Sequence, residues 1–185
     1  MTRLLLVAHA LNASLRRVEF GGSAGLDPAG ATAARRLVAA DNGALSGPVL
    51  TGPAPACRET AAAFGVPVRV EDALADCDYG SWTGRTLPDL AAEQPGAVRR
   101  WLTDPASAPH GGESVDALVR RVAGWLDALR DDRVVAVTHA AVVRASLVHS
   151  LAAPVAAFWQ LDVAPLATVR LDRRDVRWHL RLGGS

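Results

Sequence analysis

The chain has 185 residues, of which 50% are hydrophobic and 21% charged, and its 20 basic side chains against 19 acidic ones give a net charge of +1 at neutral pH. This composition predicts one soluble globular domain over residues 1–185, with a hydrophobic core that needs no disulfide or metal. The nearly balanced charge lacks the positive field that nucleic acid or an anionic membrane requires, so we expect neither as a partner.

The first apolar run, from Arg3 to Val7, predicts a buried strand. It is too short for a signal peptide and is followed closely by His9, so we expect a cytoplasmic protein. Two further compact apolar runs, Pro48 to Thr51 and Arg133 to Thr138, predict strands suited to the centre of a parallel sheet. No stretch is long and apolar enough to span a membrane.

Segments with helical periodicity separate these strands. Helices are expected from Pro28 to Ala40, from about Cys57 to Phe64, from Val115 to Arg130 and from about Ala140 to Leu151. The third of them has the clearest apolar face, and Ser114 is its expected N-cap.

The last predicted elements form a hairpin at the sheet edge, from Thr168 to Leu171 and from Val176 to Leu182. Alternation of strands and helices favours a three-layer α/β/α sandwich with a mostly parallel central sheet and this antiparallel hairpin near the C-terminus. A second copy of the chain could pair with the hairpin or with the apolar Phe158-Trp159, which makes a homodimer a candidate assembly.

Two histidines stand directly after predicted strands. His9 follows the first strand and His139 follows the strand that ends at Thr138. Ligands of open α/β sheets bind at the carboxyl ends of the strands, so both imidazoles could face one crevice. His139 also opens a helix, whose unpaired amides would favour an anionic group. The alternative is that each histidine is only a hydrogen-bonded structural residue.

Short motifs occur in a characteristic order along the chain. They are Ala8-His9-Ala10, residues 26–30, residues 51–61, residues 76–84, Gly111-Gly112-Glu113-Ser114 and Val137-Thr138-His139-Ala140. Together they resemble the Arg-His-Gly, Leu-x-Pro-x-Gly, Ser-Ser-Pro, Gly-x-Trp-x-Gly, Gly-Gly-Glu-Ser and Ser-His-Gly motifs of the histidine phosphatase superfamily, the phosphoglycerate-mutase-like proteins. The resemblance covers nearly the whole chain.

This resemblance implies a phosphoryl-transfer site for a small molecule. It implies that His9 is the nucleophile that becomes phosphohistidine, that His139 contacts the phosphoryl oxygens, and that Asp76 is the general acid for the leaving oxygen. Glu113 could share the acid's role or cap its helix, and Asp76 could instead be a turn residue bonded to its own loop. A metal held by the two histidines and a carboxylate lacks a close-spaced ligand pair, so we expect no metal and no other cofactor.

The chain departs from the family at its phosphate clamp. The two clamping arginines of the family correspond to Ala8 and Ala56, and the glycine after the nucleophile is replaced by Ala10. Alanine neither neutralises charge nor donates a fork of hydrogen bonds. Loss of one charge-stabilising donor commonly lowers a rate by a factor of roughly 100 to 1,000, so ordinary phosphatase activity should be severely impaired.

Other residues are candidates for contacting a substrate. Arg16 and Arg17 lie in the loop after the first strand, whereas Arg58 stands about 200° around the helix from position 56. Each of these arginines could instead be a solvated surface residue. Further candidates are Asn12, His110 and Thr138.

Three hypotheses follow for the function. The first is a divergent enzyme that retains His9, His139 and a carboxylate and performs hydrolysis or acid–base chemistry on a neutral or less anionic small molecule. The second is an inactive pseudoenzyme that binds a metabolite or a protein. The third is a phosphomonoesterase in which an arginine from elsewhere lies within hydrogen-bond reach of His9.

Overall fold

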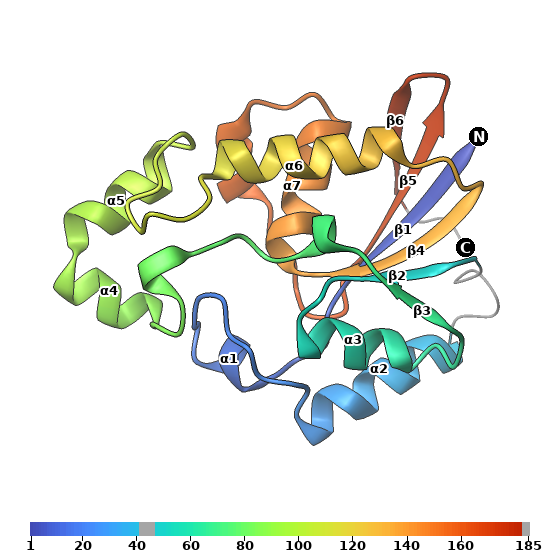
Figure 1. Cartoon of the computed structure of the whole chain (residues 1–185), viewed down its shortest axis with the longest axis horizontal. Coiled ribbons are helices and arrows are strands. Elements are labelled where there is room, and N and C mark those ends of the chain that lie inside the picture. Colours follow the sequence, from blue (N-terminus) through green and yellow to red (C-terminus); the bar gives the residue numbers. More distant parts are fainter. Residues whose placement is uncertain (41–46, 183–185) are drawn as a thin grey trace.

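The computed structural model of the chain describes residues 1–40 and 47–182, and a six-stranded sheet in the order β3-β2-β4-β1-β5-β6 forms its centre (Figure 1). β1, β4, β2 and β3 run parallel, whereas β5 is antiparallel to β1 and forms a hairpin with β6. The strands are β1 (Thr2–Ala8), β2 (Val49–Thr51), β3 (Val68–Val70), β4 (Arg133–Thr138), β5 (Thr168–Arg174) and β6 (Arg177–Arg181).

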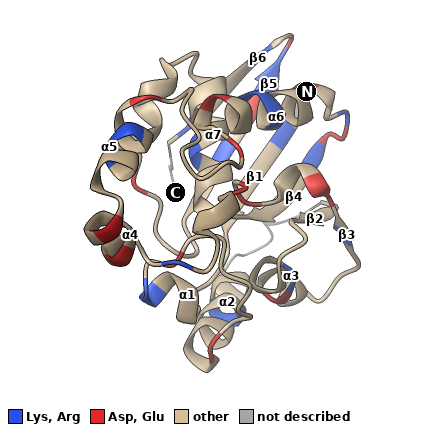
Figure 2. Ribbon diagram, turned by 60° about the vertical axis from the view of Figure 1, so that its left-hand side comes forward, with Lys and Arg blue, Asp and Glu red and all other residues tan. Residues whose placement is uncertain are grey.

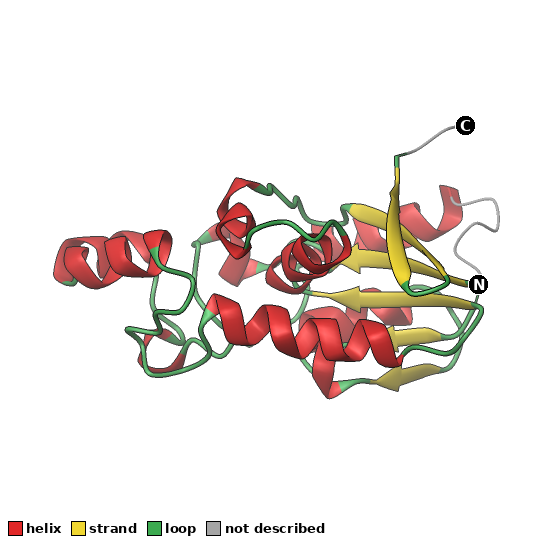
Figure 3. Ribbon diagram, turned by 90° about the horizontal axis from the view of Figure 1, so that it is seen from above, coloured by secondary structure: helices red, strands yellow, loops and turns green. Residues whose placement is uncertain are grey.

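Helices cover both faces of the sheet. α2 and α3 lie on one face and α6 and α7 on the other (Figure 1), while α4 and α5 lie beyond the ends toward which the parallel strands point (Figure 3). The α-helices are α1 (Ala13–Arg16), α2 (Pro28–Ala40), α3 (Pro55–Ala62), α4 (Leu87–Glu93), α5 (Pro95–Thr103), α6 (Val115–Ala128) and α7 (Ala140–Ser150). The 3-10 turns are η1 (Asp72–Leu74), η2 (Gly80–Trp82) and η3 (Val155–Gln160).

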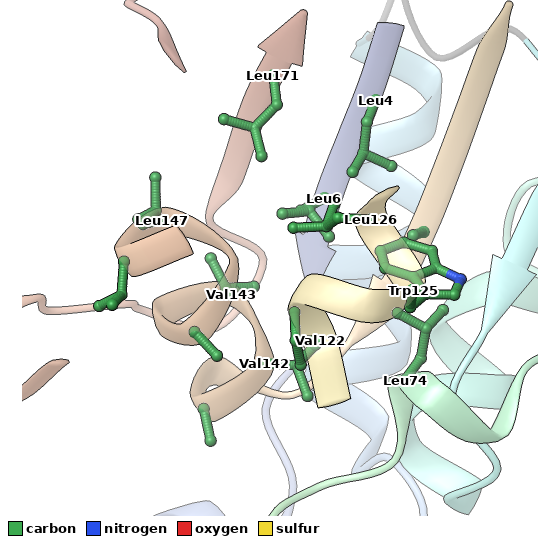
Figure 4. Close-up of a cluster of buried hydrophobic side chains, with 14 of the residues drawn as sticks. Leu4, Leu6, Leu74, Val122, Trp125, Leu126, Val142, Val143, Leu147 and Leu171 are labelled. Carbon is green, nitrogen blue, oxygen red and sulfur yellow. The ribbon is translucent and has the colours of Figure 1, made fainter. Parts of the chain in front are cut away.

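The core explains the continuous apolar run of β1. Leu4 and Leu6 pack with the buried faces of α6 and α7 (Figure 4), whereas Leu5 and Val7 pack on the opposite side with residues of α3. Successive residues of a strand point to opposite faces, so a strand that is covered on both faces is apolar throughout.

The structure confirms the predicted fold class and most of the predicted elements. β4 has its predicted bounds, and α6 begins after Ser114, whose side chain accepts a hydrogen bond from the amide of Ala117. β3 was not predicted, because its three residues include an arginine and lie at the half-exposed edge of the sheet. In the described ranges, no helix is both long enough and apolar enough to cross a membrane.

Candidate active site

The ladder between β1 and β4 places His9 and His139 side by side. Ala8 and Thr138 are paired in the parallel register, and the amide of His9 donates to the carbonyl of Thr138 at 2.8 Å. Each histidine is the residue that follows its strand, so the two rings meet at the carboxyl edge, with their centroids 5.0 Å apart and their planes at 77°. Both side chains are buried.

The hydrogen bond of His9 selects one tautomer. Its Nδ1 lies 2.8 Å from the carbonyl oxygen of Ala10, and because a carbonyl only accepts, Nδ1 carries the proton. Nε2 of the neutral ring therefore holds the lone pair. Burial, followed by the neighbouring His139, lowers the pKa of His9 below its usual value. His9 is thus a neutral imidazole with a nucleophilic Nε2 at pH 7.

Asp76 supplies the carboxylate closest to the two imidazoles. Its Oδ2 lies 3.4 Å from Nδ1 of His139, and its Oδ1 accepts a hydrogen bond of 2.9 Å from the amide of Cys77. The second contact is the turn interaction considered from the sequence, and it coexists with the first. Nε2 of His139 is buried and has no hydrogen-bond partner within the described residues.

A pocket of about 250 Å³ opens at this edge of the sheet. Its ionisable lining consists of Asp76, Asp78, His139, Cys77 and Tyr79, and none of the arginines that the structure describes lines it. Burial raises the pKa of Cys77 and of Tyr79, so both keep their protons at neutral pH. The remaining lining residues are Gly21, Gly22, Ser23, Ala54, Pro55 and Thr83.

The two clamp positions are packed into the protein as alanines. Ala8 ends β1 and Ala56 lies in the first turn of α3, and their side chains are 3% and 2% exposed. Thr60 fixes the loop after His9, because its Oγ1 accepts a hydrogen bond of 3.0 Å from the amide of Ala10 and donates one of 2.7 Å to the carbonyl of Ala56.

The candidate replacement arginines do not enter this site. Arg16 pairs with Asp27 at 2.9 Å and Arg17 with Glu19 at 2.6 Å, both at the surface. Arg58 is exposed on α3. Throughout residues 1–40 and 47–182, no arginine is hydrogen-bonded to His9, which removes the geometric support for the third hypothesis.

Glu113 belongs to a neighbouring interaction. Arg121 of α6 donates hydrogen bonds of 2.9 and 2.8 Å to its two carboxylate oxygens. The same guanidinium donates to the carbonyls of Ala73, Ala75 and Asp76. Glu113 therefore orients the arginine that holds the Asp76 loop, and the structure does not bring it to the imidazoles.

The protein engages the polar groups of three other candidates, except Nε2 of His110, which is buried without a hydrogen-bond partner among the described residues. The Asn12 side chain caps α1 and donates to the carbonyl of Ala24, and the hydroxyl of Thr138, which has no exposed surface, donates to the carbonyl of Leu74. His110 is buried against Trp82, and its Nδ1 accepts from the amide of Gly112. These contacts occupy the side chains of Asn12 and Thr138 and one ring nitrogen of His110.

Three residues that shape the site were not predicted from the sequence as site residues. Asp78 and Tyr79 line the pocket from within the motif of residues 76–84, so the motif located them without indicating their roles. Arg121 lies on the polar face of an amphipathic helix next to the exposed Arg120. No sequence signal separates these two arginines.

Solved structures share this fold over nearly the whole chain. A mycobacterial glucosyl-3-phosphoglycerate phosphatase in complex with inorganic phosphate superposes with a TM-score of 0.83 at 25% identity, covering 98% of this chain and 96% of that chain. The alpha-ribazole phosphatase of Shigella flexneri has a TM-score of 0.86 at 21% identity, covering 100% and 96% of the two chains.

Curated relatives agree with this likeness. The chain is 35% identical over 130 residues to the bifunctional protein Rv2228c of Mycobacterium tuberculosis, covering 65% of this chain and 35% of that protein. It is 29% identical over 123 residues to phosphoserine phosphatase 1 of Hydrogenobacter thermophilus, covering 63% of this chain and 58% of that protein. The chain thus spans well under two thirds of these relatives' length. Residues 4–184 match the family model of the histidine phosphatase superfamily, branch 1, and the chain belongs to that family.

Proposed function

We propose that the chain is a small-molecule hydrolase whose substrate carries less negative charge at its reacting group than a phosphomonoester does. Family membership and the phosphatases among its relatives support the proposal that the chain is a hydrolase. The single observation that supports a less anionic substrate is the pocket beside the paired histidines: it is lined by two aspartates and, among the described residues, by no arginine. Catalysis then relies on nucleophile and acid rather than on an anion clamp.

His9 is suited to be the nucleophile. Its Nδ1–H is fixed on the carbonyl of Ala10, and its lowered pKa keeps the ring neutral, so Nε2 attacks the electrophilic atom. As the new bond to Nε2 forms, the bond to the leaving oxygen breaks. That oxygen takes the proton of the Asp76 carboxyl, the nearest acid to the two imidazoles.

The second half of the reaction regenerates the site. Water attacks the group carried by His9, gives a proton to the Asp76 carboxylate and releases Nε2. His139 stands beside His9 at the N-terminus of α7, where the helix end and the imidazole together stabilise modest negative charge on the intermediate.

This arrangement gives little stabilisation to the transition state of a dianionic substrate. It would meet the carboxylate of Asp78, next to the Asp76 carboxyl that gives up its proton, without the two guanidinium groups that the family's motifs provide. Each missing donor costs about 2.7 to 4 kcal/mol of transition-state stabilisation. An ester or a singly charged phosphodiester develops less charge and loses less.

The second candidate function is binding without catalysis. The observation that favours it is that both clamp positions are filled by buried alanines, a change that closes the family's usual chemistry. In that case the pocket beside His139 holds a metabolite, and replacement of His9 leaves binding largely intact.

Hydrolysis of three nitrophenyl probes tests the proposal. The probes are 4-nitrophenyl acetate, bis(4-nitrophenyl) phosphate and 4-nitrophenyl phosphate, compared for wild type, His9→Ala and His179→Ala. His179 is an exposed imidazole on β6, so its variant measures the background that any surface histidine contributes. We expect turnover of the acetate or the diester that is lost in His9→Ala and kept in His179→Ala.

Other outcomes decide against parts of the proposal. A preference for 4-nitrophenyl phosphate over both other probes would refute the charge argument. Absence of His9-dependent turnover with all three probes would leave the binding-only function.

An added arginine provides a test by gain of function. Ala56→Arg should raise activity on 4-nitrophenyl phosphate at least tenfold, because position 56 lies in the first turn of α3, next to the pocket-lining Pro55. Ala56→Leu adds bulk without charge and serves as the matched control.

A further inference from the structure

A second hollow adjoins the pocket beside His139. It has a volume of about 440 Å³ and shares Asp76 and Asp78 with the first pocket as lining residues. Its other lining residues are Asp72, Ala75, Gly112, Glu113 and Arg121. We call the two hollows together the acidic groove.

The acidic groove is negatively charged. Four acidic side chains line it: Asp72, Asp78 and Glu113 as carboxylates, and Asp76 as the proposed proton donor. The single guanidinium of Arg121 faces them. That guanidinium is saturated by Glu113 and by three backbone carbonyls, so it offers nothing to an anionic ligand. Five other arginines gather on β5 and β6, the hairpin at the sheet edge (Figure 2).

Asp78 stands where the two hollows meet. Its side chain is exposed, and its Oδ1 accepts a hydrogen bond of 2.9 Å from the amide of Gly80, which fixes the direction of the carboxylate. No basic side chain pairs with it in the described part of the chain. Its negative charge is therefore available to a ligand.

A further group in the same pocket indicates a ligand. His139 lines the pocket, is 7% exposed, and has an Nε2 that lacks a hydrogen-bond partner among the described residues. A buried polar atom without a partner at a pocket is satisfied when a ligand or water occupies that pocket.

We propose that the substrate bears a positively charged nitrogen group, an ammonium or a guanidinium, which Asp78 binds in the acidic groove while the reacting group lies at His9 and His139. This inference rests on the proposed hydrolase function and names the class of its substrate. Asp78 is then a specificity-determining residue: it acts on the choice of substrate through charge, and Asp76 and the histidines act on the reacting atoms.

A pair of isosteric thioesters tests the proposal. Acetylthiocholine and S-(3,3-dimethylbutyl) thioacetate have the same acetyl group and nearly the same shape, but only the first carries a cationic nitrogen. We expect wild type to prefer the cationic probe by about tenfold in kcat/KM, the factor that about 1.4 kcal/mol of charge attraction provides. Added salt should reduce this preference.

Variants locate the source of the preference. Asp78→Asn keeps the acceptor for the amide of Gly80 but removes the charge, so the ratio of the two kcat/KM values should fall below about twofold. Asp72→Asn, which removes a carboxylate that lines only the second hollow, should lower the ratio to about threefold. Asp175→Asn removes a carboxylate in the turn between β5 and β6 and serves as the matched control that keeps the full ratio. A ratio near one in wild type, or one that Asp78→Asn leaves unchanged, overturns the proposal.

Binding to His9→Ala separates this proposal from the proposed function. NMR titration with choline and with its neutral isostere 3,3-dimethylbutan-1-ol should show about tenfold tighter binding of choline. Selective binding of choline without turnover of either thioester in wild type would support cation binding in the acidic groove and refute the hydrolase function. Equal turnover of both thioesters would support the hydrolase function and refute cation binding in the acidic groove. Absence of both selective binding and selective turnover refutes the inference.

Discussion

Replacement of Arg121 tests the role assigned to Glu113. The guanidinium makes five hydrogen bonds, two to Glu113 and three to the carbonyls of Ala73, Ala75 and Asp76, at 2.8 to 3.2 Å. Its side chain is 27% exposed and that of Glu113 is 15% exposed. Removing one partner of a fully buried pair costs about 3 to 5 kcal/mol, and partial exposure reduces this to about 2 to 4 kcal/mol for Arg121→Met.

Urea denaturation and thermal melting measure this loss. For a chain of this size, about 3 kcal/mol corresponds to a decrease in Tm of roughly 6 to 12 °C. Arg120→Met, the exposed neighbour on the same helix, should change the free energy of unfolding by less than about 0.5 kcal/mol. Equal effects of the two substitutions would refute the reasoning.

Substitutions of Glu113 and Asp76 distinguish the roles of the two carboxyl groups. Glu113→Gln should lose about 1 to 2 kcal/mol of stability and keep most of the His9-dependent turnover, because its carboxylate serves Arg121. Asp76→Asn should lose the turnover instead, since Asp76 faces His139. The opposite pattern would make Glu113 the acid.

The remaining predictions concern His9 and its surroundings. The folded protein holds the pKa of His9 below its usual value of about 6.5. The stability that the neutral ring contributes is therefore complete above pH 6.5 and declines as the pH falls toward the lowered pKa. Urea denaturation at pH 7 and at pH 5 should show that His9→Gln loses less free energy of unfolding between the two pH values than wild type does. Thr60→Val should cost about 1 to 2 kcal/mol by leaving the amide of Ala10 without its acceptor, whereas Thr60→Ser should melt within a degree or two of wild type. Gly80→Ala should sharply reduce the yield of folded protein, because the residue has a φ of 45° and an added Cβ would collide with a backbone carbonyl. Gly96→Ala has no neighbouring atom within 4 Å to meet and should fold normally, so equal yields would contradict this explanation.

The sequence predicted the parts of the fold that depend on local patterns. β1 and β4 are buried on both faces, so they occur as continuous apolar runs, and the residue after each run is a histidine. This pattern was sufficient to place the candidate nucleophile and its partner at one sheet edge. The three residues of β3 carry no comparable pattern.

Contacts between distant loops could not be predicted in the same way. Arg16 and Arg17 were expected in a loop that could reach the pocket, whereas the structure places them at the end of α1, paired with Asp27 and Glu19. Likewise, Glu113 and Arg121 are eight residues apart, and the three carbonyls that complete their interaction come from the turn at residues 73–76. Such interactions depend on chain geometry that composition and periodicity do not determine.

The ladder between β1 and β4 makes the placement of the two histidines independent of the loops that line the pocket in front of them. Backbone bonds in the middle of the sheet set the separation of the two imidazoles, whereas loops and the first turn of α3 set the electrostatic character of the space in front of them. Exchange of side chains in those loops alters which molecules enter and leaves the relative position of the rings unchanged. The scaffold therefore offers a fixed pair of histidines with an interchangeable entrance, a property that an engineer could exploit by redesigning only the loops.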